Sequence, residues 1–375
     1  MKNIRDLFSI AALRRVYSLF LIVGLLVSQT ACGNQESEIA KLVQTVKLSK
    51  PPMQTVWRPD GKRFAADGFG SLAVWDAATG QQIPTPPMWV DSQSVLYSPD
   101  GRLLVLRKLV REGQRNIRSV VVLDAQDHHV IREFAGMYPI EDGKAFSPDS
   151  RLLIVAVDKQ DGYRNVAAVL DVETGSVMAE LKTLHTDPNA KGEDHIERVV
   201  YSPDGATVVI AFVTNKIDVW STKDWHLVKT FKAHKGWIRS MAISPDGKWL
   251  VTGNVSGGTG GRYDPATGIT TEIKYDDPIK IWDTSTWQQV GALPIHDKYT
   301  SSLAFLPDGK HLISANEDRI LFWNMQTRKQ VGVIKGGFKG GGALNFALSQ
   351  DGEYLVVGGM GTLEVQVWKI VGQLN

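Results

Sequence analysis

Ser244-Pro245-Asp246-Gly247-Lys248-Trp249 is the stretch of sequence that decides the fold, because variants of its first four residues occur seven times. Pro presets φ at the second position of a tight turn, the Asp carboxylate accepts a local backbone N–H, and Gly tolerates positive φ. Short alternating apolar runs flank each copy, which predicts a β-hairpin around it. The other copies are Arg58-Pro59-Asp60-Gly61, Ser98-Pro99-Asp100-Gly101, Ser147-Pro148-Asp149-Ser150, Ser202-Pro203-Asp204-Gly205, Leu306-Pro307-Asp308-Gly309 and Ser349-Gln350-Asp351-Gly352.

A third strand follows each hairpin and ends in Trp-Asp or a related pair. In six copies a short turn comes next, with Thr79-Gly80 and Thr174-Gly175 the clearest, and then a fourth strand. A unit of four strands that repeats seven times predicts seven sheets arranged around one axis. The pairs are Trp75-Asp76, Leu123-Asp124, Leu170-Asp171, Trp220-Ser221, Trp282-Asp283, Trp323-Asn324 and Trp368-Lys369.

On these motifs, residues 41–370 resemble the WD40 repeat family, and the resemblance implies an all-β, seven-bladed β-propeller. The seventh copy ends at Trp368 with only seven residues left, too few for its fourth strand. We expect residues 41–48 to supply that strand, because interlocked chain ends remove two exposed sheet edges. The predicted propeller domain is residues 41–375, closed by an N-terminal strand that completes the last blade.

WD40 blades are similar in using a His, a Ser or Thr, an Asp and the Trp as a buried hydrogen-bonded set. The resemblance implies one such set in copy five and another in copy six, and hence a structural role for both histidines, since buried polar side chains usually satisfy one another. In copies two and three, Leu123 and Leu170 stand at the Trp position, so apolar packing must replace the hydrogen bonds there. The two sets are His234, Thr252, Asp277 and Trp282, and His296, Ser314, Asp318 and Trp323.

The N-terminal segment has the pattern of an export signal. Residues 1–15 carry four basic residues against one acidic residue, and residues 16–27 are uncharged and mostly apolar. The pair Ala31-Cys32 directly after this run resembles the end of a bacterial lipoprotein signal peptide, which implies cleavage before Cys32 and acylation of that residue. We therefore expect a signal peptide over residues 1–31, a short tether over residues 32–40, and an exported lipoprotein on the periplasmic or cell-surface side of a membrane.

Two other interpretations of this segment stay open. An uncleaved signal anchor would need a membrane-spanning helix of ~20 apolar residues, and this run is shorter. Alternatively, Cys32 follows an ordinary signal peptide by chance; position 29 is Gln, where lipoprotein signals usually have an aliphatic residue.

Composition narrows the function classes. The chain has 375 residues, 43% apolar and 22% charged, with one Cys, which excludes a disordered chain, a disulfide scaffold and a zinc-finger array. Residues 1–31 carry four of the 42 basic and one of the 40 acidic residues, so the remainder has 38 against 39 and favours neither nucleic acid nor a strongly anionic substrate. The sequence contains no Gly-x-Ser-x-Gly, His-Glu-x-x-His, Walker or Cys-x-x-Cys motif, and we expect no catalytic residues, cofactor or metal.

The connections between strands differ in length on the two faces of the predicted propeller. Between the third-strand Asp, or its counterpart, and the next apolar residue the spacing is seven residues in six copies. All insertions fall on the opposite face, which we call the long-loop face, and insertions on one face of a repeat protein usually mark its binding surface. The insertions are residues 84–93, 107–118, 158–165, 183–197, 253–278 and 335–343.

The candidate partner-binding residues lie on this face. Seven residues before each turn we expect a ring around the channel mouth, and exposed Trp and Tyr carry contact area at low entropy cost; Trp237 covering only its own blade is the alternative. Arg111 and Arg115 belong to a basic hairpin at residues 107–118 that is either a patch for an anionic partner surface or a solvated protrusion. The ring is Asp91, Ile140, His195, Trp237, Tyr299 and Gly342.

The sequence therefore predicts a non-catalytic protein-protein interaction platform in the bacterial cell envelope. Its partners would be envelope proteins on the long-loop face and the membrane through a lipid on Cys32, with no nucleic acid, and the protein would be a monomer. The tether of at most ~30 Å would hold the short-turn face toward the membrane. The main alternative is a propeller enzyme or small-ligand binder that uses the central channel mouth, and a third is a factor that assists outer-membrane assembly.

Overall fold

The protein is described by a computed structural model, in which the chain divides between Glu36 and Ser37 into two units. The structure describes the second unit from Ile39 onward. The residues outside the description are 1–38, 69–70, 86–89, 113–114, 141–144, 158–165, 183–194, 255–258, 265–268, 275–278, 294–299, 336–343, 360, 373 and 375. The predicted signal peptide and tether, including Cys32, lie almost wholly among them.

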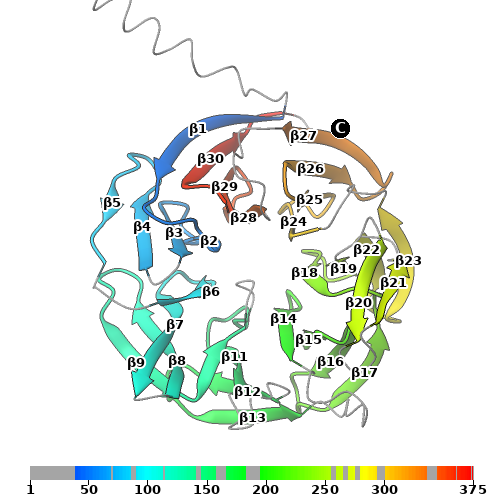
Figure 1. Ribbon diagram of the computed structural model, residues 1–375, viewed down its shortest axis with the longest axis horizontal. Coiled ribbons are helices and arrows are strands. Elements are labelled where there is room, and N and C mark those ends of the chain that lie inside the picture. Colours follow the sequence, from blue (N-terminus) through cyan, green and yellow to red (C-terminus); the bar gives the residue numbers. More distant parts are fainter. Residues whose placement is uncertain are drawn as a thin grey trace, which may run out of the picture. The chain divides into compact units, whose positions relative to one another are not determined.

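Seven four-stranded antiparallel sheets surround a central axis, and the all-β, seven-bladed prediction is confirmed (Figure 1). Blades are numbered here by the order of their tight turns. Blade one is β2 (Gln54–Trp57), β3 (Arg63–Gly68), β4 (Ser71–Asp76) and β5 (Gln82–Ile83); blade two is β6 (Val90–Tyr97), β7 (Leu103–Glu112), β8 (Arg115–Asp124) and β9 (Val130–Ala135); blade three is β10 (Met137–Pro139), β11 (Leu152–Val157), β12 (Val166–Asp171) and β13 (Val177–Lys182); blade four is β14 (Ile196–Tyr201), β15 (Thr207–Phe212), β16 (Lys216–Ser221) and β17 (Leu227–Lys232).

The remaining blades differ from this pattern in two places. Blade five is interrupted by an additional two-stranded sheet, and blade seven takes its outer strand from the N-terminal side of the chain. Blade five is β18 (Ile238–Ile243), β19 (Trp249–Asn254), β22 (Ile279–Asp283) and β23 (Gln288–Leu293), with β20 (Thr259–Asp264) and β21 (Ile269–Lys274) as the additional sheet; blade six is β24 (Ser302–Phe305), β25 (His311–Ala315), β26 (Arg319–Asn324) and β27 (Lys329–Lys335); blade seven is β28 (Leu344–Leu348), β29 (Tyr354–Gly359), β30 (Glu364–Ile370) and β1 (Ala40–Lys47). The described residues contain no helix of the length and apolarity that a membrane span requires.

Strand β1 closes the ring as predicted. It pairs antiparallel with β30, from Ala40 opposite Ile370 to Lys47 opposite Glu364, and completes the order β1-β30-β29-β28. Ile39 and Ala40 are buried at one end of the strand, and Val46 is buried at the other. The first described strand, β1, and the last one, β30, therefore share one blade, and β30 is paired on both sides.

In five of the seven repeated turns one serine hydroxyl bridges the two strands of the hairpin. In blade five, Ser244 Oγ donates to Asp246 Oδ1 at 2.6 Å and accepts the Trp249 N–H at 3.0 Å, while Gly247 N–H donates to Ser244 O. Gly247 has φ +73°, a conformation that costs Gly little. The same two serine bonds recur at Ser98, Ser147, Ser202 and Ser349.

The turns also contact one another around the axis. A Cβ added to Gly205 would lie 3.5 Å from Pro148 Cδ, and in five of the seven turns a glycine packs in this way against the proline of the preceding turn; the third turn has Ser150 in place of Gly. Gly61 is the exception, with nothing within 4 Å of such a Cβ, because the preceding turn has Gln350 in place of Pro. The other Gly-Pro contacts are Gly101 with Pro59, Gly247 with Pro203, Gly309 with Pro245, and Gly352 with Pro307.

Packing between blades supplies the core. Leu123 and Leu170, which stand at the Trp position in blades two and three, are fully buried. Their burial agrees with the expectation that apolar packing replaces the tryptophan hydrogen bonds in these blades. Each outer strand from blade two to blade seven carries a β-bulge opposite the Trp position, which increases the twist of an edge strand and protects it from pairing with other chains. The residues skipped in the pairing are Ile131, Met178, Val228, Val290, Val331 and Val43.

The predicted polar sets are partly seen. Thr252 Oγ1 accepts the Trp282 indole N–H at 2.9 Å and lies 2.7 Å from His234 Nε2, all three side chains being buried. In blade six, Trp323 Nε1 donates to Ser314 Oγ at 2.7 Å. Asp277 and His296 lie outside the described residues.

Asp318, the aspartate implied for the blade-six set, is more exposed than a buried set would require. Its side chain is 63% exposed, and its Oδ1 lies 3.0 Å from Arg319 Nε. The buried residue in this connection is Asn316, whose Oδ1 accepts the N–H groups of Asp318 and Arg319. An Asn two residues earlier thus shapes the turn and leaves the aspartate in solvent.

Candidate interaction surface

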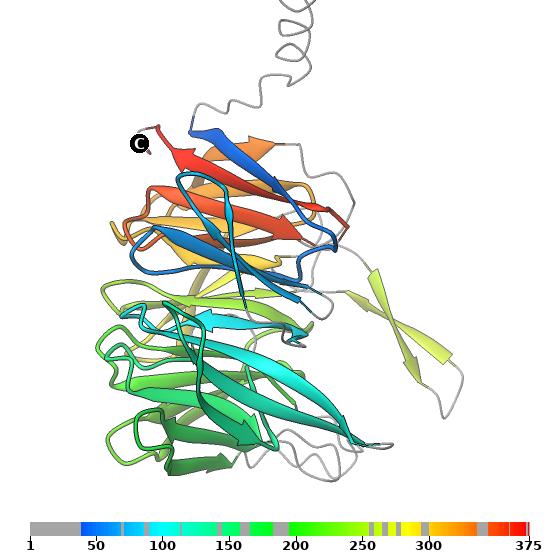
Figure 2. The ribbon, with the colours of Figure 1, turned by 90° about the vertical axis from the view of Figure 1, so that its left-hand side faces the viewer.

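The two faces of the propeller have different connections, as predicted. The tight turns and the third-to-fourth-strand turns lie on one face, and the two long elements whose backbone is described rise from the other. These are the hairpin of β7 and β8 and the sheet of β20 and β21, which we call the blade-five arm. Figure 2 shows both on the same side of the disc, opposite the short turns.

The basic hairpin forms as predicted at the level of the backbone. Strands β7 and β8 pair continuously from Leu103 opposite Asp124 to Glu112 opposite Arg115. At its base, Lys108 Nζ lies 2.8 Å from Glu133 Oε2, so part of its positive charge is paired. Arg111 and Arg115 are in the strands, and their side chains lie outside the description.

Trp237 is the most distinctive side chain of the long-loop face. It is 55% exposed, and it is the one aromatic residue among the large, highly exposed apolar side chains of the described chain. Arg239 lies over it, with the guanidinium carbon 5.5 Å from the ring centroid. The pair combines an apolar platform with a planar cation that carries several N–H donors.

The backbone below Trp237 is held firmly. Ala233 N–H donates to Asn215 O, and Lys280 Nζ donates to Ala233 O at 2.8 Å. His234, the next residue, is buried on Thr252. Trp237 is therefore presented on a fixed segment, which reduces the entropy lost when a partner binds.

The rest of the predicted ring is only partly visible. Ile140 is buried, so it cannot contribute to an exposed surface. His195 is half-buried, and its carbonyl accepts the Val213 N–H. Asp91 lies in β6, which begins at Val90 and so extends into the segment expected to be a loop. The side chain of Asp91 is outside the described part of the structure, and Tyr299 and Gly342 are not among the described residues.

Among the residues that the structure describes, one group of potential metal ligands lies on the short-turn face. Asp124, Asp127 and His129 bring their ligand atoms within 4.8 Å of one another in the turn between β8 and β9. Turn geometry explains the group: Asp124 Oδ1 accepts the Gln126 N–H, and Asp127 Oδ1 lies 2.6 Å from His129 Nδ1. The His129 N–H and ring lower the pKa of Asp127, and Asp127 in turn raises the pKa of His129.

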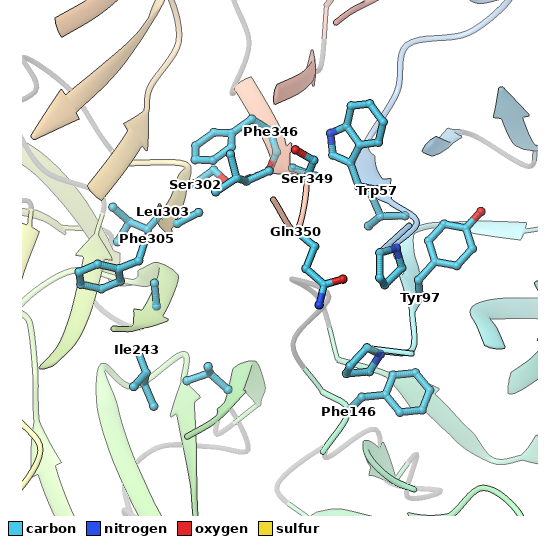
Figure 3. A pocket seen from close by; sticks show the side chains of 18 of the residues that line it. Trp57, Tyr97, Phe146, Ile243, Ser302, Leu303, Phe305, Phe346, Ser349 and Gln350 are labelled. Atoms are coloured by element: carbon cyan, nitrogen blue, oxygen red, sulfur yellow. The ribbon is translucent and has the colours of Figure 1, made fainter. Parts of the chain in front are cut away.

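The central channel forms a cavity of about 580 Å³. Figure 3 shows aromatic side chains around it and Gln350 extending into it. Its lining is apolar apart from hydroxyl and amide side chains such as Ser302, Asn345 and Gln350. Six turn prolines border it, namely Pro59, Pro99, Pro148, Pro203, Pro245 and Pro307.

Two stretches of the chain match a known repeat. Residues 225–259 and 287–324 match the family model described as "WD domain, G-beta repeat", and they contain the hydrogen-bonded residues His234, Thr252, Ser314 and Trp323. These two stretches lie in blades four to six of the seven-bladed propeller. Among the described residues of the long-loop face, Trp237 offers an exposed aromatic surface suited to contact with another molecule.

Similar proteins cover only part of the chain. It is 27% identical to the nuclear distribution protein PAC1 of Arthroderma otae over 38% of this chain and 43% of that protein. It is 31% identical to the periodic tryptophan protein 2 homolog of Schizosaccharomyces pombe over 32% of this chain and 12% of that protein. The chain thus spans less than half the length of these relatives, and both are eukaryotic, so they do not bear on a bacterial envelope setting.

Sequence reasoning missed two parts of this surface. It treated residues 253–278 as a long insertion without predicting the arm, although Arg262-Tyr263 and Ile269-Thr270-Thr271 are β-prone residues around a Pro and Gly turn signal. It also did not select Arg239 as a candidate binding residue. The i, i+2 spacing of Trp237 and Arg239 places both on one side of an extended strand, and that was the available signal.

Proposed function

We propose that this WD40 propeller is a non-catalytic protein-interaction platform of the bacterial cell envelope, exported and anchored through a lipid on Cys32. The observation that carries the platform is the exposed Trp237 on a rigid segment of the face that also bears the hairpin and the arm. The opposite face consists of closely similar short turns whose polar groups bond within the turn. A partner protein with a complementary surface would therefore dock on the long-loop face.

The envelope setting is supported by the N-terminal sequence. A basic segment, an apolar run and Ala31-Cys32 stand in the order of a lipoprotein signal. Strand β1 starts on the short-turn side, because it runs antiparallel to β30, which ends there. A short tether to the membrane would accordingly leave the long-loop face accessible.

Site-specific photo-crosslinking tests the platform. A crosslinker replaces Trp237 in cells that express the full chain, and a second one replaces Thr174 on the short-turn face as the matched control. Mass spectrometry of the adducts is expected to identify one protein captured from position 237 and not from position 174. Equal capture from both positions, or none from 237 in folded protein, would overturn the platform.

A separate experiment tests the anchor. Cys32→Ser is expected to move the protein from the membrane fraction to the soluble fraction and to abolish incorporation of radiolabelled palmitate. Membrane retention of the Ser variant would refute lipidation at Cys32 without affecting the proposed platform.

The central channel is the second candidate site, because its volume lies within the range of small-molecule pockets. Its named lining residues are apolar, amide or hydroxyl groups, which suit a neutral ligand better than acid-base chemistry. Failure of the crosslinking experiment would therefore make a screen of neutral metabolites the next step.

A further inference from the structure

Blade five brings the arm and Trp237 to one place. Ile238, the residue after Trp237, pairs with Asn254 at the end of β19, and Gly253 pairs with Ile279 at the start of β22. The insertion that contains the arm thus leaves and re-enters the blade beside the exposed indole. No other blade in the described part of the chain combines an additional sheet with an exposed tryptophan.

The arm has open edges. Strands β20 and β21 pair with each other from Thr259 opposite Lys274 to Asp264 opposite Ile269, and within the described residues they form a sheet of their own. A two-stranded ribbon is marginally stable in water, and each strand presents a row of backbone N–H and C=O groups on its outer side. Such a ribbon gains stability when another extended segment pairs with it.

Charge defines the chemistry of that segment. The Arg239 guanidinium contacts the Trp237 ring and forms no ion pair with any described carboxylate. On the neighbouring strand β14, Arg198 donates to the Arg239 carbonyl at 2.7 Å and lies 3.4 Å from the Glu197 carboxylate, so that carboxylate already has a cation beside it. A free guanidinium against an indole suits a carboxylate whose neighbouring side chain is apolar, because the ring receives the apolar group while the N–H donors bind the oxygens.

We infer that the occupant of this site is an extended, acidic segment of a partner protein, which pairs as a strand with an edge of the blade-five arm. One of its carboxylates binds Arg239, and an adjacent apolar side chain rests on Trp237. This inference rests on the proposed function and names the partner's recognition element.

Peptide selection tests the inference. The probe is a display library of random 12-residue peptides, selected on the immobilised full chain in detergent. Enriched sequences are expected to combine Asp or Glu with Val, Ile, Thr or Tyr and to lack Pro. Replacing alternate peptide N–H groups of the best binder by N-methyl groups is expected to abolish binding on one alternation only, because a paired strand bonds through every second residue.

Three variants and one control locate the site. Arg239→Gln is expected to weaken the best peptide by about tenfold and to remove the selection for acidic residues, as expected for a lost charged hydrogen bond. Trp237→Ala and replacement of residues 255–278 by a short Gly-Ser turn are each expected to weaken it by at least about tenfold. Arg102→Gln, an exposed arginine on the short-turn face, is expected to leave affinity unchanged.

The outcomes are distinguishable from those of the crosslinking test. Enrichment of neutral or basic peptides, or acidic binders indifferent to the arm deletion, overturns the inference. So does self-association that Trp237→Ala abolishes, because a second copy of the chain would then be the occupant. If position 237 captures a partner whose binding survives Arg239→Gln and the arm deletion, the platform stands and the strand-pairing inference falls.

Discussion

Buried polar side chains in this propeller differ in whether their hydrogen bonds are satisfied. The indole N–H of Trp282 and the imidazole of His234 converge on one threonine hydroxyl, whereas Tyr97 and Tyr201 bury hydroxyl groups that have no hydrogen-bond partner among the described residues. Both tyrosines are less than a tenth exposed. An unsatisfied buried hydroxyl costs free energy that its removal recovers.

Tyr97→Phe and Tyr201→Phe are therefore expected to leave the free energy of unfolding at pH 7 unchanged or to raise it by about 1 kcal/mol. Burial raises the pKa of Tyr97 to about 12 and also raises that of Tyr201. Because the folded-state pKa is raised, the neutral phenol stabilises the fold below pH 10, and this contribution is lost as pH rises toward 12. Urea unfolding at pH 7 and pH 11 would measure it; a Phe variant that loses as much stability as wild type at pH 11 would contradict this expectation.

His128 is a second residue whose surroundings predict a pH effect. It is 2% exposed with φ +64°, at the position where Gly80 and Gly175 stand in their turns. Burial lowers the pKa of His128, so its neutral form stabilises the fold above pH 6.5, and that contribution is lost as pH falls below this value.

His128→Gly should therefore flatten the dependence of unfolding free energy on pH between 7 and 5, while relieving a strained backbone. Chemical denaturation at several pH values is the measurement. His226→Gly, in the equivalent turn of blade four, is the control, because that imidazole is exposed and pairs with Asp224. An unchanged pH slope in His128→Gly would show that another group carries the acid sensitivity.

At the scale of the element, a tight turn stabilises its own hairpin and also contacts the turn of the next blade. The serine-aspartate bonds shape the turn, and the proline receives the glycine of the following turn. The seventh turn keeps the serine bonds at Ser349 but has Gln350 instead of Pro. Its backbone thus matches turns that accept Pro at that position.

Gln350→Pro is accordingly expected to stabilise the protein by roughly 0.4–1 kcal/mol, because it restricts the unfolded chain without straining the turn. Pro203→Gln, the reverse change in an equivalent turn, should lose a similar amount. Thermal and urea unfolding of both variants would measure this; a destabilised Gln350→Pro protein would show that the seventh turn differs from the others.

At the scale of the whole molecule, ring closure depends on one strand. Strand β1 joins the beginning of the described chain to β30 near its end, and buried Trp368 packs beneath it with Ile39 and Ala40. Without it, β30 becomes an open edge and the seventh blade loses a quarter of its strands.

Deletion of residues 41–48 is expected to cause aggregation and a large loss of thermal stability. Val43→Ser, at the exposed bulge of the same strand, should change neither, since Val43 is 55% exposed. Size-exclusion chromatography and thermal melting would compare the two. Wild-type solubility and melting in the deletion variant would show that the ring closes without β1.

The sequence determined the blade count, the turn chemistry and the closing strand, because each depends on residues that are neighbours in the chain: Ser244 to Trp249 shape a turn, and Ala40–Lys47 form one extended run before the first repeat. It also located Trp237 on the long-loop face by spacing alone. Tertiary structure alone decided that Gly61 lacks a proline neighbour and that the arm leaves blade five beside Trp237. These features depend on contacts between residues far apart in the chain, which a repeating local pattern does not encode.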